Sequence, residues 1–431
     1  MITTANVMLW GKRIGVVAWN SEQRLGTFEF TKAYDEQPWD IAPLMMPKRQ
    51  KRIFGFLELK NNNTYKGLPG LLADVLPDQY GSALINAWLG AAGRPTNSLN
   101  PVELLCYIGN RGMGAMEFEP TLTEPNTKAI KLEVDGLVTI AQRILNQRNA
   151  FKTNLKKETE KGLLDLITVG TSAGGTRAKA IIAYNEKTGE VRSGQTNAPR
   201  GFKQWLIKFD GVTDVELGGS HGFGRVEMAY HLMAKACRIT MSECRLLEEH
   251  GRAHFMTRRF DREANAKLHL QSLCAMAHFD FEKVGVYSYE QVFEVMRRLR
   301  LPYQDAEQQY RRMVFNVLAR NCDDHTKNIA FLMHPNGVWS LSPAYDLCYA
   351  YRPGSPWVSM QSLRVNGKRE NITIEDFIAV AKKMNIKKPN EIITQIQNVL
   401  KQWKTFAKEV GVEKKLIDSI DKTLVLRFDS H

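Results

Sequence analysis

The feature that most constrains this 431-residue chain is a polar octet, NCDDHTKN, at residues 321–328. The apolar residues that precede it at helical spacing are Tyr310, Met313, Val314, Val317 and Leu318. This stripe predicts a helix that ends near Arg320. The octet is therefore expected to form a loop at the C-terminal end of that helix.

An apparent β-hairpin follows the octet. Apolar runs at residues 329–333 and 338–341 flank the turn sequence HPNG, and SPAYDL comes directly afterwards at residues 342–347. Because a hairpin returns the chain to where it started, Asp346 is predicted to lie near the octet.

Two carboxylates and an amide would then converge, from Asp323, Asn328 and Asp346, and Lys327 would offset part of their charge. Mg²⁺ prefers such oxygen ligands together with water and substrate phosphates. Protein kinases use one Asp to orient the attacking hydroxyl, an Asn of the same loop to bind metal, and a second Asp to bind Mg²⁺. The interval from Asp323 to Asn328 equals the Asp-to-Asn interval of the kinase catalytic loop.

Two other interpretations of the octet remain. Asp323, Asp324 and Asn328 are residue types that cap helices and turns. A metal hydrolase would instead use Asp323, His325 and Asp346 as ligands, but it gives no reason for Lys327 and Asn328.

A glycine-rich segment, GTSAGGTRAK, occupies residues 170–179. Glycines let backbone N–H groups approach phosphate oxygens, and Arg177 or Lys179 would add positive charge. Gly170 and Gly175 have the spacing of a Walker A motif, but the lysine of that motif and the kinase G-x-G-x-x-G are both missing. An ordinary hairpin turn is an equally good interpretation.

Lys208 lies in an apolar strand predicted at residues 205–209. A charged side chain there needs a partner or an outlet into a polar cleft, and ATP phosphates are one such partner. Glu227, on a helix predicted at residues 225–236, is the candidate ion-pair partner by analogy with kinases. An exposed strand face is the alternative for Lys208. The sequence RRFDR at residues 258–262 indicates either a buried salt-bridge network or a partner surface.

The remaining pattern predicts an α+β protein with a β-rich lobe followed by a larger helical lobe. Strands are predicted at residues 5–10, 14–19, 26–30, 166–169 and 180–184, and helices from about Leu84 and at 138–147. Residues 123–127 look like a linker. Beyond Glu243 we expect mostly helix, broken by the one hairpin. The domains predicted are 1–245, with a nucleotide-binding β lobe from about residue 150, and 246–431.

The net charge of +13 favours polyanionic partners, although each basic cluster is also compatible with a solvated helix face. No apolar run is long enough to cross a bilayer, and the N-terminus has no signal-peptide pattern, so a soluble cytoplasmic protein is expected. The scattered cysteines, without a C-x-x-C pair, favour reduced thiols over zinc or disulfides.

Together these segments resemble a known family. The octet and SPAYDL closely resemble the catalytic and metal-binding segments of HipA-type serine/threonine kinase toxins. The loop SAGGTRAK at residues 172–179 looks like the family's phosphate-binding loop, and LLADVLPDQYG at residues 71–81 is similar to its N-terminal signature. RFDR at residues 259–262 matches a further family element.

The resemblance implies a two-lobed protein-kinase-like fold and specific roles. Asp323 would be the catalytic Asp, and Asn328 and Asp346 the Mg²⁺ ligands. The residues expected to bind ATP are Ser172, Gly174, Gly175, Lys179, Lys208 and Lys327. Ser172 would also be the site of autophosphorylation. A phosphate there would bring nearly two negative charges into a loop that holds the anionic nucleotide, and so would inactivate the enzyme.

The resemblance also implies partners. Family members bind a HipB-type DNA-binding antitoxin and arrest growth by phosphorylating a translation component such as an aminoacyl-tRNA synthetase. DNA contact would come only through the antitoxin complex, where the basic residues Lys382, Lys383, Lys387 and Lys388 are candidates. The alternatives are a catalytically silent subunit that co-represses transcription with the antitoxin and a kinase for a small molecule. The intact set Asp323, Asn328, Asp346 and Lys208 favours an active kinase over the silent subunit.

Overall fold

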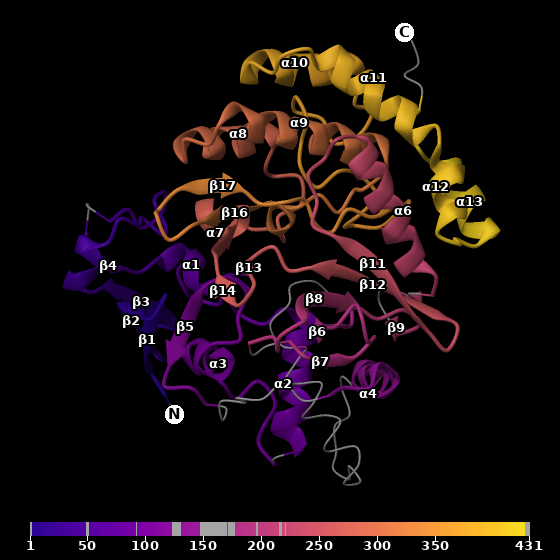
Figure 1. The fold of residues 1–431 in the computed structure, drawn as a ribbon. Helices are drawn as coiled ribbons and strands as arrows, with labels where there is room; N and C mark the ends of the chain where they lie inside the picture. The colour runs from indigo at the N-terminus through magenta and orange to yellow at the C-terminus, as the bar shows by residue number, and fades with distance from the viewer. Residues whose placement is uncertain are drawn as a thin grey trace.

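A computed structural model describes residues 2–48, 51–91, 93–122, 131–146, 170, 177–194, 197–214, 218–219 and 221–426 (Figure 1). The linker predicted at residues 123–127 and the strand predicted at 166–169 lie outside these ranges. Among the described residues, no helix combines the length and apolar character needed to span a bilayer.

The N-terminal sheet has the strand order β4-β3-β2-β1-β5, with all neighbours antiparallel. Its strands are β1 (Thr4–Leu9), β2 (Lys12–Asn20), β3 (Leu25–Phe30), β4 (Ile53–Phe54) and β5 (Met116–Glu119). In β1, buried Ala5, Val7 and Leu9 alternate with more exposed residues, because one face of the sheet is packed on the core. The first three predicted strands are confirmed.

Helices connect this sheet to the rest of the molecule. They are α1 (Gly70–Ala73), α2 (Gln79–Ala91) and α3 (Pro101–Ile108). A capping box begins α3, in which the side chains of Asn100 and Glu103 each accept a hydrogen bond from the other residue's backbone N–H. The predicted helix near Leu84 corresponds to α2.

The central sheet has the order β11-β12-β8-β6-β7. Its strands are β6 (Lys179–Tyr184), β7 (Val191–Ser193), β8 (Lys203–Lys208), β11 (Cys244–Glu249) and β12 (Arg252–Arg258), with β9 (Thr213–Asp214) and β10 (Gly218–Gly219) pairing nearby. Helix α4 (Val134–Asn146) and α2 share a hydrophobic core with one side of this sheet, and α6 (Phe223–Ala236) packs on β11 and β12. Strands β6 and β8 and helices α4 and α6 confirm the corresponding predictions.

The expectation of mostly helix beyond Glu243 is wrong for residues 244–272. Strands β11 and β12 form a hairpin there, and β13 (Arg262–Glu263), β14 (Ala266–Lys267) and β15 (His269–Ser272) follow. The hairpin turn has positive φ at both His250 and Gly251, as a tight two-residue turn requires. The domain boundary predicted after residue 245 falls inside β11.

The helical lobe contains a small sheet of order β15-β16-β17, formed with β16 (Ala330–Met333) and β17 (Trp339–Leu341). Its helices are α7 (Leu273–Ala277), α8 (Tyr289–Arg298), α9 (Tyr303–Leu318), α10 (Ile374–Met384), α11 (Pro389–Leu400), α12 (Trp403–Glu409) and α13 (Lys414–Asp421). Figure 1 places α8 to α11 on the opposite side of the central sheet from α2 and α4. The predicted helix before the octet and the predicted hairpin after it are both confirmed.

A buried charge network connects the part of the chain that forms the first sheet and α1 to α3 (residues 4–119, called the N-terminal domain from here on) to the centre of the molecule. The Asp261 carboxylate, 0% exposed, accepts hydrogen bonds from Arg259, Arg262 and the backbone N–H of Gly114. Burial alone would raise the pKa of Asp261, but the two guanidinium groups outweigh it and lower that pKa strongly. Arg262 also donates to the carbonyl of Gly112 at 3.1 Å. Residues 259–262 of the RRFDR segment therefore form a buried salt-bridge network, whereas the Arg258 side chain is exposed.

Candidate active site

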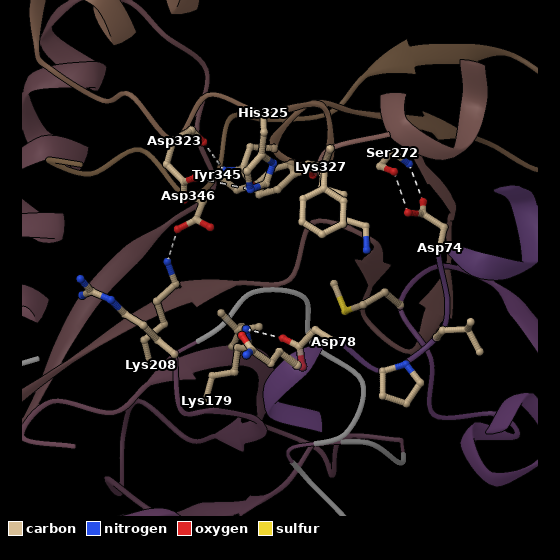
Figure 2. A pocket seen from close by; sticks show the side chains of 18 of the residues that line it. Asp74, Asp78, Lys179, Lys208, Ser272, Asp323, His325, Lys327, Tyr345 and Asp346 are labelled. Carbon is tan, nitrogen blue, oxygen red and sulfur yellow. Dashed lines mark hydrogen bonds and ion pairs between the residues drawn. The ribbon is translucent and has the colours of Figure 1, made fainter. Parts of the chain in front are cut away.

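A cavity of about 1690 Å³ lies between the central sheet and the helical lobe. The predicted site residues that line it are Lys179, Lys208, Glu227, Asp323, Lys327, Asn328 and Asp346. Figure 2 shows the charged groups of Lys179, Lys208, Asp323, Lys327 and Asp346 around one space, together with Asp74 and Asp78 from the N-terminal domain. The fold thus brings together residues that are up to about 270 positions apart in the sequence.

Lys208, at the end of β8, is held by two carboxylates. Its Nζ lies 2.6 Å from Glu227 Oε1 on α6. The same Nζ lies 2.5 Å from Asp346 Oδ1 (Figure 2). Burial opposes the charged ammonium, but Asp346 and then Glu227 outweigh it and raise the pKa of Lys208. The predicted ion pair with Glu227 is therefore present, and the lysine of this apolar strand points into the polar cavity.

Asp346 follows β17 and has left-handed backbone geometry, with φ +55°. Burial would raise the pKa of this carboxyl, but Lys208 outweighs the burial and the pKa falls to about 2. The neighbouring Tyr345 hydroxyl donates to the backbone carbonyl of Lys327 at 2.6 Å. The hairpin therefore returns the chain to the octet, as its sequence predicts.

The octet loop presents Asp323 to the cavity. Its side chain is 47% exposed, and His325 Nε2 lies 3.6 Å from Asp323 Oδ1. Asn328 donates its amide N–H to the Asp323 carbonyl at 2.8 Å, which fixes the loop and leaves the amide oxygen of Asn328 as an acceptor. The Thr326 hydroxyl donates to the carbonyl of Phe279 at 2.6 Å and anchors the middle of the loop.

Asp324, unlike Asp323, points into the protein interior and is buried. Its carboxylate accepts from the Tyr289 hydroxyl at 2.7 Å, the Gln361 side-chain amide at 3.1 Å and the Ser362 backbone N–H at 2.7 Å. Burial raises the pKa of Asp324 to about 6. Asp324 therefore has a structural role, but it bonds to residues distant in the sequence and does not cap the preceding helix or the turn, whereas Asp323 faces the cavity.

Two further cations line the same space. Lys327 Nζ lies 4.5 Å from the centroid of the Phe281 ring and points into the opening of the cavity (Figure 2). Lys179, on β6, forms an ion pair with Asp78, with Nζ and Oδ2 2.8 Å apart.

Part of the predicted phosphate loop is outside the described residues. Ser172, Gly174 and Gly175 fall in the undescribed range 171–176, so their predicted roles are untested. Arg177, which follows, lies with its guanidinium carbon 4.6 Å from the centroid of the Phe223 ring at the start of α6.

The described residues of the cavity offer few oxygen ligands from the protein. This suits Mg²⁺, and it does not suit a metal ion whose ligands all come from protein side chains. Asn328 and Asp346 offer an amide oxygen and an ionised carboxylate, and Mg²⁺ takes its remaining ligands from water and phosphates. In the described part of the chain, no group of three or more His, Cys, Asp or Glu side chains is placed to hold a metal ion. Asp323, His325 and Asp346 therefore do not form the ligand set of the hydrolase alternative.

Sequence reasoning assigned no role to two acidic residues of the cavity. Asp74 and Asp78 come from the segment between α1 and α2, and Figure 2 shows them opposite the octet. Asp74 accepts hydrogen bonds from the backbone N–H and the hydroxyl of Ser272, both at 2.6 Å. Both residues lie in the segment LLADVLPDQYG, which resembles the family's N-terminal signature, but that resemblance carried no role for either carboxylate.

Comparison with known proteins identifies the family. The sequence model of the HipA-like C-terminal domain matches residues 171–403, which is more than half of the chain. The chain belongs to the HipA family. The model of the HipA N-terminal domain matches residues 5–119 of this HipA-family chain as well.

A solved HipA structure shares the fold of this chain. It is the toxin–antitoxin complex of HipA, HipB and operator DNA from Shewanella oneidensis MR-1, matched with a TM-score of 0.68 at 16% identity over 98% of this chain and 96% of that chain. The two-lobed kinase-like α+β architecture is thereby confirmed. The proinflammatory kinase CtkA of Helicobacter pylori matches with a TM-score of only 0.32 at 13% identity, over 52% of this chain and 88% of that one. No curated protein sequence matches this HipA-family chain.

Proposed function

We propose that this HipA-family protein is an ATP- and Mg²⁺-dependent serine/threonine protein kinase that acts as the toxin of a HipBA-like module. The main observation behind the proposal is that Lys208 forms ion pairs with both Glu227 and Asp346. These ion pairs lie in the cavity that Asp323 faces. A strand lysine paired with a helix glutamate, beside a metal-binding Asp and a catalytic-loop Asp and Asn, is the arrangement by which protein kinases transfer a phosphoryl group.

Each residue has a defined task in this proposal. Lys208 would bind phosphate oxygens of ATP, and Glu227 would keep its ammonium in place. Bound between Asn328 and Asp346, Mg²⁺ would neutralise charge on the phosphates. Asp323 would accept the proton of a serine or threonine hydroxyl as that oxygen bonds to the γ-phosphorus and ADP leaves. Lys327 would balance the negative charge of the transferred group.

The proposed partners follow from family membership and fold. The matched Shewanella structure contains HipB and operator DNA, which supports a HipB-like antitoxin as partner and DNA contact through that complex. The basic residues Lys382, Lys383, Lys387 and Lys388 are all exposed around the end of α10 and the start of α11, where DNA could reach them. A translation component such as an aminoacyl-tRNA synthetase is the proposed protein substrate.

Intact-mass measurement after incubation with ATP and Mg²⁺ tests the activity, with Asp323→Ala as the control. We expect one added phosphoryl group in the wild type and none in the variant, because only the wild type can activate the acceptor hydroxyl. No added mass, together with no thermal stabilisation by ATP, would favour the silent co-repressor subunit instead. A phosphoryl group transferred only to metabolites would favour the small-molecule kinase.

A further inference from the structure

Two lysines of the central sheet stand side by side in the cavity. Lys179 on β6 and Lys208 on β8 are directly opposite each other in the antiparallel register. Directly opposite residues of antiparallel strands project from the same face of a sheet, so both ammonium groups point into the cavity. Lys208 has a carboxylate partner from its own lobe, Glu227.

The carboxylate beside Lys179 comes from the N-terminal domain. Asp78 Oδ2 lies 2.8 Å from Lys179 Nζ, and the two side chains are only 10% and 2% exposed. Burial raises the pKa of Asp78 and lowers that of Lys179, so the pair is costly to bury. Burying either charge without the other would cost more free energy than burying the pair. Each residue therefore depends on the other.

The backbone around Asp78 is fixed at two places. Asp78 Oδ1 accepts the backbone N–H of Gly81 at 2.6 Å, at the start of α2. Four residues earlier, Asp74 binds Ser272 at the start of α7 in the helical lobe. Residues 74–78 therefore contact both the central sheet and the helical lobe, with the cavity between the two contacts (Figure 2).

We infer that Asp78 is a positioning residue for nucleotide binding: it holds the Lys179 ammonium beside that of Lys208, so that the N-terminal domain completes the phosphate site. The inference rests on the proposed function, since it takes the phosphates of ATP as the anion. Each of the two strand lysines then has its own carboxylate, Glu227 from α6 and Asp78 from the N-terminal domain. A kinase core without this N-terminal domain would lack Asp78, the carboxylate that pairs with Lys179.

Equilibrium binding of ATP with Mg²⁺, and of adenosine, to the full-length protein tests the inference. We expect Asp78→Asn to weaken ATP binding by about tenfold, or about 1.4 kcal/mol, because Lys179 loses its fixed position. Adenosine binding should be unchanged, because adenosine carries no phosphate. In a Lys179→Met background, Asp78→Asn should have no further effect on ATP binding, since Asp78 acts through that lysine. Glu186→Gln, which removes the exposed Glu186–Lys203 ion pair of the same sheet, is the matched control.

The outcomes separate the inference from the proposed function. A wild type that binds no ATP would contradict the proposed function itself. ATP affinity that is equal in the wild type and Asp78→Asn would overturn only the positioning role. Equal losses for ATP and adenosine would also overturn it, because they would indicate a purely structural ion pair. If Asp78→Asn does not fold, Asp78→Glu keeps the charge and displaces Lys179, and the same selective loss of ATP affinity is expected.

Discussion

Asp323 and Asp324 are consecutive residues with opposite surroundings. The Asp323 side chain is 47% exposed to the cavity, whereas Asp324 is 2% exposed and receives hydrogen bonds from Tyr289, Gln361 and Ser362. The buried carboxyl holds the loop against residues 361–362, and the exposed one faces the cavity. One dipeptide thus combines a structural contact with the carboxylate that we propose as the catalytic one.

Asp324 should give the protein a specific pH dependence of stability. Burial raises its folded-state pKa from 3.8 to about 6, so the folded protein binds this proton more tightly than the unfolded chain does. The resulting stabilisation amounts to at most about 3 kcal/mol. It is complete below about pH 4 and is lost as the pH rises through about 6. Urea unfolding of wild type and Asp324→Asn from pH 4 to 7 measures it. The free energy of unfolding of the wild type minus that of the variant should fall as the pH rises. A difference that stays constant would contradict this expectation.

Lys208→Met should abolish phosphoryl transfer and destabilise the fold by about 3–5 kcal/mol at pH 7, because Glu227 and Asp346 would lose the one ammonium group that bonds to both of them. Part of the loss should be recovered at lower pH as a carboxylate takes up a proton. Lys203→Met is the matched control on the same strand. Its ion pair with Glu186 is exposed, so a change below about 1 kcal/mol is expected. Similar losses in the two variants would argue against the two-carboxylate site.

Asn328→Ala should raise the Mg²⁺ concentration needed for half-maximal phosphoryl transfer by about tenfold or more, because an oxygen ligand and the bond that fixes Asp323 are both lost. A Mg²⁺ titration at saturating ATP measures the shift. Asn336→Ala, in the exposed turn of the following hairpin, is the matched control and should leave the titration unchanged. An unaltered midpoint in Asn328→Ala would remove this residue from the metal site.

Ser172→Ala should retain ATP binding and escape self-inactivation, since the phosphate that would displace the glycine-rich loop can no longer be attached. Mass mapping of the phosphorylated peptide and a time course of activity toward an added substrate test this together. Autophosphorylation that persists unchanged in the variant would place the modified residue elsewhere.

Much of the site could be predicted from the sequence because it depends on local order. The octet, the hairpin and Asp346 are close in the chain, so turn geometry alone indicates that they meet. Lys208 could be singled out because a charge in an apolar strand needs a partner. Glu227 required the analogy with kinases, since it is 19 positions away on another element.

The contribution of the N-terminal domain could not be predicted in this way. Asp78 and Lys179 are about a hundred positions apart, and no periodicity relates them. Likewise, β11 and β12 were mistaken for the start of a helical region, because their tight turn uses His250 and Gly251, a weaker signal than Asn-Gly or Asp-Gly. Asp323 could be chosen over Asp324 from its interval to Asn328, but the packing that buries Asp324 against Tyr289 and residues 361–362 is not contained in the octet.

The buried network of Arg259, Asp261 and Arg262 couples the unfolding of the N-terminal domain to that of the rest of the protein. Besides bonding to one another, these groups donate to the carbonyl of Gly112 and accept the N–H of Gly114, both from the N-terminal domain. If the N-terminal domain unfolded alone, it would leave buried guanidinium groups without these partners inside the remaining protein, at a cost of several kcal/mol. The two parts should therefore unfold cooperatively, as a single calorimetric transition, and the domain that carries Asp78 should behave as a permanent part of the protein.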